Sequence, residues 1–112
     1  MERTLTCAAL RALVADRASI AVVDVRRQPA FEAEPRLIPG AVWKEPEQVA
    51  IWAAELNQGQ PVVVYCVHGH EVSNGVVDRL RALDFDAALL EGGIEAWKAA
   101  GGRVSVSSGG TK

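Results

Sequence analysis

The amino-acid sequence predicts an α/β fold: a small, mainly parallel five-stranded sheet with helices on both faces. Short apolar runs rich in β-branched residues alternate along the chain with segments whose apolar residues recur at helical spacing. Such alternation is typical of a parallel sheet, because each helix carries the chain back across one face before the next strand. The chain has 112 residues, enough for one domain with a modest core.

Three strands and two helices are expected in the first half of the chain. The hydroxyl of Thr6 can accept a hydrogen bond from the first turn of a helix that ends near residue 16. The segment 27–40 contains three prolines and is expected to be a loop with at most one short helical turn. Pro46 can begin a second helix, because a proline in the first turn removes no helical hydrogen bond. The strands are expected at residues 3–5, 20–23 and 41–43, and the helices at residues 7–16 and 46–56.

The second half of the chain carries the strongest strand signal. The β-branched run 62–64 follows Pro61 and predicts a buried strand. Apolar residues then recur at helical spacing, and the glycines at 92–93 predict a tight turn before the last helix. The strands are expected at residues 62–65 and 87–90, and the helices at residues 73–83 and 94–100.

Composition favours a single small domain. Hydrophobic residues make up 49% of the chain and charged residues 23%, which is ordinary for a soluble globular protein. Residues 1–104 are expected to fold as one domain, followed by a flexible tail at 105–112 that is rich in serine and glycine. The formal net charge of −2 gives no reason to expect nucleic acid or a membrane as a partner.

The sequence also favours a cytoplasmic, reducing setting. Charged residues interrupt any signal-peptide core near the N-terminus. No apolar run reaches the roughly 18 residues that a transmembrane helix needs. The two cysteines, Cys7 and Cys66, are too few for a disulfide scaffold. We expect Cys7 to be a packing residue and Cys66 to be free for chemistry.

Cys66 ends the strongest strand and precedes a polar turn around Gly69. Functional sites of parallel sheets lie at the carboxyl ends of strands, where Asp24 and Glu91 should also fall. The turn leads into a helix N-terminus, where backbone N–H groups and the helix dipole stabilise an anion. Such a setting favours the thiolate, which is the nucleophilic form of cysteine. Cys66 is therefore predicted to be a catalytic nucleophile.

Four sequence blocks resemble a single-domain rhodanese. They are DVR at 24–26, IPGA at 38–41, VYC at 64–66 with a glycine three residues on, and LEGG at 90–93 followed by Trp97. Their order and spacing extend the resemblance over roughly residues 4–103. The resemblance implies a rhodanese-like fold and a sulfurtransferase that needs no metal or organic cofactor.

The resemblance also implies which residues take part. Cys66 is the sulfur carrier, which takes a sulfane sulfur from a small sulfur-containing anion such as thiosulfate, or from a persulfide. It passes that sulfur to cyanide or to a thiol, including a thiol on a protein. Backbone N–H groups of the loop after the cysteine are expected to hold the negative charge of the persulfide. The substrate-binding loop comprises Val67, His68, Gly69, His70 and Glu71.

Two positions depart from the common family pattern. Leu37 stands before the IPGA block, where many members carry a histidine. Glu71 ends a loop in which thiosulfate-using members often carry basic residues. A carboxylate beside an anionic donor costs binding energy unless protonated His68 and His70 offset it. We therefore expect these departures to affect the choice of donor more than the sulfur-transfer chemistry.

Three other interpretations apply to Cys66 and its loop. Free cysteines are often inert core residues. A phosphatase or arsenate reductase uses a Cys-x5-Arg loop, but this chain has Val72 at the arginine position and its next arginine is Arg79. Cys66, His68 and His70 could suggest a metal site, yet ligands so closely spaced rarely converge, so no metal is expected.

A non-catalytic function is also open. The domain could sense oxidants, or relay sulfur that a partner protein delivers as a persulfide. An enzyme and a relay module need the same reactive thiolate, so the sequence does not separate them. Asp24 and Arg26 have two open roles, either as a structural pair that braces the loop or as groups that contact substrate.

Overall fold

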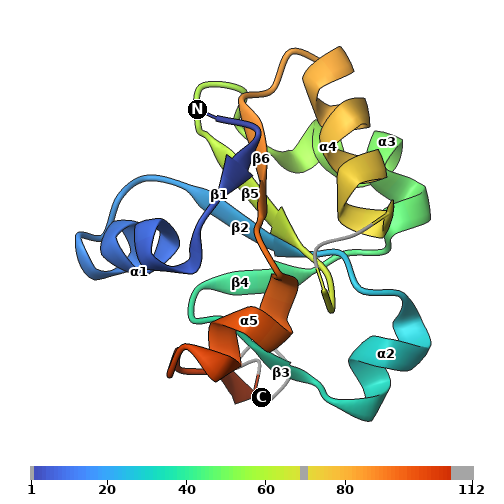
Figure 1. Ribbon diagram of the computed structural model, residues 1–112. Helices are drawn as coiled ribbons and strands as arrows, with labels where there is room; N and C mark the ends of the chain where they lie inside the picture. The colour runs from blue at the N-terminus through green and yellow to red at the C-terminus, as the bar shows by residue number, and fades with distance from the viewer. Residues whose placement is uncertain (1, 69–70, 107–112) are drawn as a thin grey trace.

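A computed structural model describes residues 2–68 and 71–106 of the chain. Within these residues the main feature is a five-stranded sheet in the order β1-β6-β5-β2-β4, whose neighbouring strands are all parallel (Figure 1). The strands are β1 Thr4–Leu5, β2 Ala21–Asp24, β4 Ala41–Trp43, β5 Val62–Tyr65 and β6 Ala87–Leu90. The predicted fold class is confirmed.

Helices cover both faces of this sheet, as predicted. The helices are α1 Cys7–Ala15, α2 Gln28–Ala33, α3 Val49–Trp52, α4 Glu71–Ala82 and α5 Gly93–Ala99. Apolar residues of α3 and α4 pack on one face, and those of α1 and α5 pack on the other (Figure 1). Among the described residues, no helix is long and apolar enough to cross a membrane.

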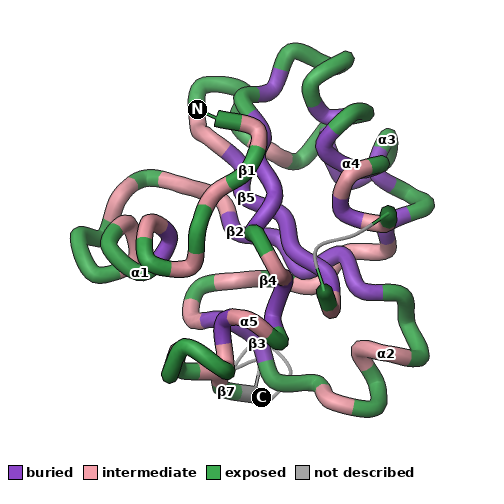
Figure 2. Tube along the Cα trace, viewed as in Figure 1, coloured by how far each residue is buried: buried purple, intermediate pink, exposed green. Residues whose placement is uncertain are grey.

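Strand β5 separates the two cores. Its side chains alternate, so that Val62 and Val64 join the core under α3 and α4, while Val63 and Tyr65 join the core under α1 and α5. All four residues are fully buried, as Figure 2 shows for β5 and β6. Burial on both faces explains why this segment reads as a continuous apolar run rather than an alternating one.

Several helix boundaries agree with the sequence. The hydroxyl of Thr6 accepts a hydrogen bond from the backbone N–H of Ala9 at 3.1 Å, so the predicted cap of α1 is confirmed. Helix α4 begins at Glu71, two residues before the predicted start. The predicted helix 46–56 is instead the short α3 between two 3-10 turns, Pro46–Gln48 and Ala53–Glu55.

Two predictions about irregular segments were wrong in part. The segment 27–40 was expected to hold at most one helical turn, yet it contains the six-residue α2, because Pro29 lies in the first turn where proline is tolerated. It also contains β3 Arg36–Leu37, which pairs antiparallel with β7 Ser105–Val106. The expected tail therefore begins with a paired strand, and 107–112 lie outside the described residues.

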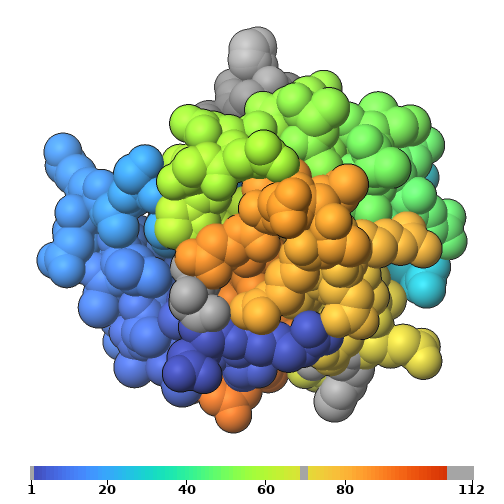
Figure 3. All heavy atoms as spheres, turned by 90° about the horizontal axis from the view of Figure 1, so that it is seen from above, coloured from blue at the N-terminus to red at the C-terminus, as the bar shows by residue number. Residues whose placement is uncertain are grey.

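The N-terminal strand is fastened to α4. The guanidinium of Arg3 donates to the side-chain oxygen of Asn74 at 2.9 Å and forms an ion pair with Asp78 at 2.8 Å. The space-filling view from above shows these N-terminal residues lying across the surface beside α4 (Figure 3). The edge strand β1 is held by this contact in addition to its pairing with β6.

Candidate active site

Cys66 follows β5 directly, at the carboxyl edge of the sheet. Its side chain continues the alternation of the strand and points into the core under α3 and α4, with only 6% of the residue exposed. The Cys66 Sγ atom lies 3.3 Å from the hydroxyl oxygen of Ser73, a fully buried residue of α4. The S–H group of the thiol donates to this oxygen, whereas a thiolate would accept from the hydroxyl.

A cavity of about 290 Å³ opens beside Cys66. Among the predicted site residues it is lined by Cys66, Val67, His68, Glu71 and Arg26. The structure thus brings together the start and the end of the predicted loop. Gly69 and His70, which the sequence analysis placed in the middle of that loop, lie outside the described residues.

The first turn of α5 forms hydrogen bonds with the start of the loop that follows β5. The backbone N–H of Ile94 donates to the carbonyl of Cys66 at 2.9 Å, and that of Glu95 donates to the carbonyl of Val67 at 3.1 Å. In a trans peptide the N–H points opposite to the carbonyl of the same unit. The N–H groups of Val67 and His68 therefore point away from α5, as a cradle for an anion requires.

Gly93 makes this close approach to α5 feasible. Its φ is +65°, in the left-handed region, where residues with a side chain are strained. A Cβ atom at this position would lie 2.5 Å from the carbonyl oxygen of Cys66 and closer still to that of Val67. The glycines at 92–93 were predicted only to form a turn, and the contact of Gly93 with the loop was not predicted. The glycine pair was the available signal.

Asp24 and Arg26 form a buried ion pair. The Arg26 Nη2 and Nε atoms lie 2.6 Å and 2.8 Å from Asp24 Oδ2, and the two side chains are 2% and 0% exposed. Arg26 also donates to the backbone carbonyls of Glu34 and Arg36, at 2.8 Å and 3.0 Å. These contacts tie the end of β2 to the segment after α2, and none of them reaches the loop after Cys66 that the pair was expected to brace. Arg26 reaches the cavity edge, whereas Asp24 does not line it.

Burial controls the protonation of the groups around this pair. It raises the pKa of Asp24, and the hydrogen bonds and charge of Arg26 oppose that rise. Burial, together with the charge of Asp24, also raises the pKa of Tyr65. The neutral Tyr65 hydroxyl accepts a hydrogen bond from the backbone N–H of Ile38 at 3.2 Å. Tyr65 therefore stays neutral near neutral pH.

The second cysteine has a different setting. Cys7 lies in α1, half-buried, with its Sγ atom 3.8 Å from the carbonyl oxygen of Glu91. Burial, and then the nearby carboxylate of Glu91, raise the pKa of the Cys7 thiol. This thiol has none of the loop geometry around Cys66, in agreement with the packing role expected for it.

No cluster of three or more His, Cys, Asp or Glu residues that could hold a metal ion occurs in the part of the chain that the structure describes. Of the loop pattern Cys66-x-His68-x-His70, His70 lies outside that part.

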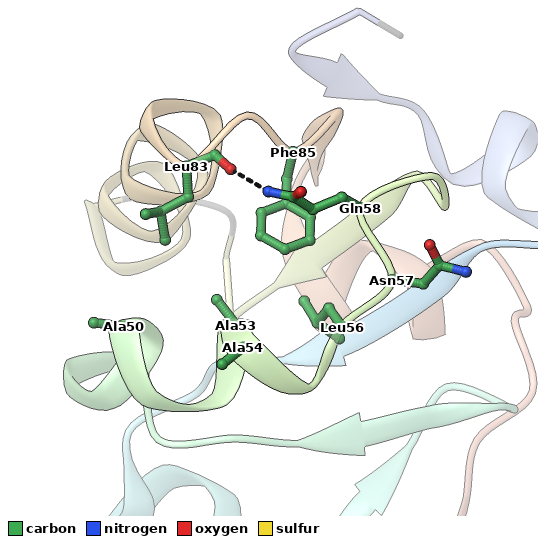
Figure 4. A pocket seen from close by; sticks show the side chains of 8 residues that line it. All are labelled: Ala50, Ala53, Ala54, Leu56, Asn57, Gln58, Leu83 and Phe85. Atoms are coloured by element: carbon green, nitrogen blue, oxygen red, sulfur yellow. Dashed lines mark hydrogen bonds between the residues drawn. The ribbon is translucent and has the colours of Figure 1, made fainter.

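A larger cavity, of about 510 Å³, lies elsewhere on the molecule. Its lining includes Leu56, Gln58, Leu83 and Phe85, and the Gln58 side chain donates to the carbonyl of Leu83 at 2.8 Å (Figure 4). These residues precede β5 and β6, so the cavity lies at the amino ends of the strands. Its lining has no charged or nucleophilic side chain. The cavity beside Cys66 is the better candidate, because active sites of parallel sheets form at carboxyl ends.

Comparison with known proteins identifies a family. The sequence model of the rhodanese-like domain family matches residues 6–100. A search of curated proteins finds no match.

Solved structures have the same fold. A full-length protein from Lactobacillus plantarum is 24% identical, with a TM-score of 0.86 over 94% of this chain and 88% of that chain. A rhodanese-like domain from Anabaena is 24% identical, with a TM-score of 0.82 over 100% of this chain and 85% of that chain. A protein of unknown function from Rhodopseudomonas palustris, described as a possible tyrosine phosphatase, is 24% identical, with a TM-score of 0.79 over 92% and 84%. Likeness at these identities establishes the fold alone.

Proposed function

The chain belongs to the rhodanese-like domain family, and from this premise we propose that it is a sulfurtransferase with Cys66 as its sulfur carrier. One observation carries the proposal. Cys66 lies at the carboxyl end of the central strand, forms a hydrogen bond with the buried hydroxyl of Ser73 and lines a cavity. The donor is a small sulfur-containing anion such as thiosulfate, or a persulfide. The acceptor is cyanide or a thiol, which can belong to a protein.

The reaction has two half-reactions. The Cys66 thiolate attacks the outer sulfur of thiosulfate, the S–S bond of the donor breaks, and sulfite leaves with the bonding electron pair. The acceptor then attacks the outer sulfur of the Cys66 persulfide, and the thiolate is regenerated. Cyanide becomes thiocyanate in this step, and a thiolate becomes a persulfide. Such covalent catalysis gives ping-pong kinetics.

The chain's own groups stabilise the charged states. The N–H groups of Val67 and His68 point away from α5 and can hold the negative outer sulfur. The hydroxyl of Ser73 can donate to Cys66 whenever the sulfur is anionic. Sulfur is itself the transferred group, so the chemistry uses no metal or organic cofactor.

A phosphatase reading has less support. The Cys-x5-Arg loop needs a guanidinium that binds the phosphate oxygens in a bidentate manner. Val72 occupies that position in α4 and packs against the core. We therefore do not propose phosphate chemistry for this chain, although one structural neighbour is described as a possible phosphatase.

Mass spectrometry of the intact protein tests the proposal. Incubation with thiosulfate should add one sulfur atom, and cyanide should then remove it. The gain should persist in Cys7→Ser and disappear in Cys66→Ser, which makes the two cysteines matched controls. The proposal is wrong if no sulfane donor adds sulfur, or if Cys66→Ser still gains it.

Steady-state turnover separates an enzyme from a relay module. An enzyme should cycle with thiosulfate and cyanide alone. A sulfur-relay or redox-sensing module would accept sulfur or oxidant at Cys66 but would turn over only with its partner protein.

A further inference from the structure

A second hollow adjoins the cavity of Cys66. Its volume is about 150 Å³, and it shares Arg27, Glu71 and Val72 with the first cavity. The shared lining makes the two hollows neighbours along the start of α4. Thiosulfate and cyanide are too small to need both.

A glycine opens this second hollow. Glu71, Gly75 and Arg79 lie four residues apart on α4, so they share one face of the helix. A Cβ atom at Gly75 would meet nothing within 4 Å. Glycine within a helix lowers its stability relative to alanine. The missing side chain leaves room between an acidic and a basic residue.

Both acidic and basic side chains line the second hollow. Arg27 and Glu47 form an exposed ion pair at 3.2 Å, which water can readily exchange. Arg79 also lines the hollow, and its guanidinium has no ion-pair partner among residues 2–68 and 71–106. Two guanidinium groups and two carboxylates thus surround a space that a small organic group could enter.

We infer that this hollow is a subsite for the charged end of an amino-acid-type thiol, which carries both a carboxylate and an ammonium group. Arg79, with Arg27, binds the carboxylate, and Glu47 and Glu71 attract the ammonium. The sulfur end of the same molecule reaches the cavity of Cys66. This inference rests on the proposed sulfurtransferase function.

In the subsite, the carboxylate of Glu71 has a binding role. Beside a purely anionic donor its carboxylate is unfavourable, but beside an ammonium group it is complementary. The thiolate of the bound molecule attacks the outer sulfur of the Cys66 persulfide. The bond between that sulfur and Cys66 breaks, Cys66 keeps the electron pair as a thiolate, and the acceptor leaves as a persulfide. No oxidant or reductant is needed.

Single-turnover transfer from the persulfidated protein tests the subsite. Four acceptors are compared: cysteine, 3-mercaptopropionate, cysteamine and 2-mercaptoethanol. Cysteine carries both charged groups, 3-mercaptopropionate only the carboxylate, cysteamine only the ammonium group, and 2-mercaptoethanol neither. Each thiol's intrinsic reactivity cancels in the ratio of variant to wild-type rate, so this ratio isolates recognition of the charged groups.

Charge variants come first. Arg79→Gln should lower the rates with cysteine and 3-mercaptopropionate by about threefold or more relative to that with 2-mercaptoethanol. Glu47→Gln should instead lower the rates with cysteine and cysteamine relative to the same reference. Arg103→Gln is the matched control, because Arg103 lines neither hollow and its loss changes the net charge equally.

Filling the hollow is the second test. Gly75→Leu should slow transfer to cysteine relative to cyanide, whereas Gly75→Ala should retain the ratio, because its methyl group leaves most of the space open. Both replacements favour the helix, so a matching thermal midpoint confirms folding.

Equal ratios for all four thiols in Arg79→Gln, or equal ratios in Gly75→Leu and Gly75→Ala, would overturn the subsite while the sulfurtransferase function stands. If the wild-type protein forms no persulfide, or transfers sulfur to no acceptor including cyanide, the proposed function fails and the subsite fails with it.

Discussion

At the scale of single residues, the site depends on one contact that the sequence did not reveal. Cys66 could be predicted because it ends a strong strand signal. Its hydrogen bond to the Ser73 hydroxyl could not, because it depends on how α4 packs against the end of β5. A helix that starts at Glu71 places Ser73 in its first turn, facing the end of β5. Ser73 lies on the buried face of α4 with Val76, Val77 and Leu80, but the spacing of these residues does not show which atom of β5 the serine meets.

Ser73→Ala should slow persulfide formation about tenfold. The change removes a hydroxyl that stabilises the anionic sulfur, and a hydrogen bond to a charged group is worth about 1.5 kcal/mol or more. The measurement is the rate of mass gain with thiosulfate, with Ser19→Ala as a control at an exposed serine. An unchanged rate in a folded Ser73→Ala protein would contradict a positioning role for the hydroxyl.

Glu71→Gln should lower the KM for thiosulfate, by about threefold at low salt. The carboxylate lines the cavity of Cys66 and repels an anionic donor, and exposed charges interact by less than about 1 kcal/mol. The difference from wild type should shrink as salt is added, because exposed charges are screened. Glu2→Gln serves as the control, since Glu2 lines neither hollow. An unchanged or raised KM would show that the repulsion is unimportant.

At the scale of elements, the five strands of the main sheet were predicted, and the two short strands of the second sheet were not. The β-branched run at 62–64 predicts strand β5 from the local sequence alone. In contrast, β3 is two residues long, and its partner β7 lies about 70 residues further along the chain. No local pattern encodes such a pairing. The length of helix α2 was underestimated for another reason, because its proline was interpreted as a helix breaker although it lies in the first turn.

Gly93→Ala should impair sulfur transfer more than stability alone explains. Both Gly93 and Gly101 have positive φ, at +65° and +84°, so alanine strains the backbone at either position. Only at Gly93 would the new Cβ collide with the carbonyls of Cys66 and Val67; at Gly101 the nearest atom lies 3.9 Å away. Gly101→Ala should lose about 1 kcal/mol of stability through backbone strain, and Gly93→Ala should lose more, because its Cβ atom also collides with the backbone.

The comparison of these two variants isolates the loop. Persulfide formation should fall at least tenfold in Gly93→Ala relative to Gly101→Ala, when both are assayed well below their unfolding midpoints. Equal rates in the two variants would mean that the contact between α5 and the loop does not position Cys66.

At the scale of the whole molecule, two cores share one central strand. Strand β5 pairs with β2 on one side and β6 on the other, and its side chains fill both cores. The five-stranded architecture followed from the alternation of elements, but the division of the cores depends on how each helix returns across the sheet.

Amide hydrogen exchange should be slower in the central strand than in the edge strands. Amides of β5 are expected to exchange slowest, through global unfolding, because both neighbours and both cores must be lost to expose them. Amides of the edge strands β1 and β4 should exchange faster. Amide-resolved exchange by NMR measures this order, and faster exchange in β5 than in β4 would contradict the two-core description.

The low exposure of Cys66 also affects which sulfur atom of a persulfide an acceptor can attack. A persulfide has two electrophilic sulfurs, and attack on the inner one expels hydrosulfide and leaves the enzyme as a mixed disulfide. The inner sulfur of a Cys66 persulfide would sit where the thiol now sits, against Ser73 in a residue that is only 6% exposed, while the outer sulfur would extend into the cavity. Steric shielding thus directs the acceptor to the productive sulfur. In the proposed reaction, the burial of the Cys66 thiol would therefore protect the persulfide from this side reaction.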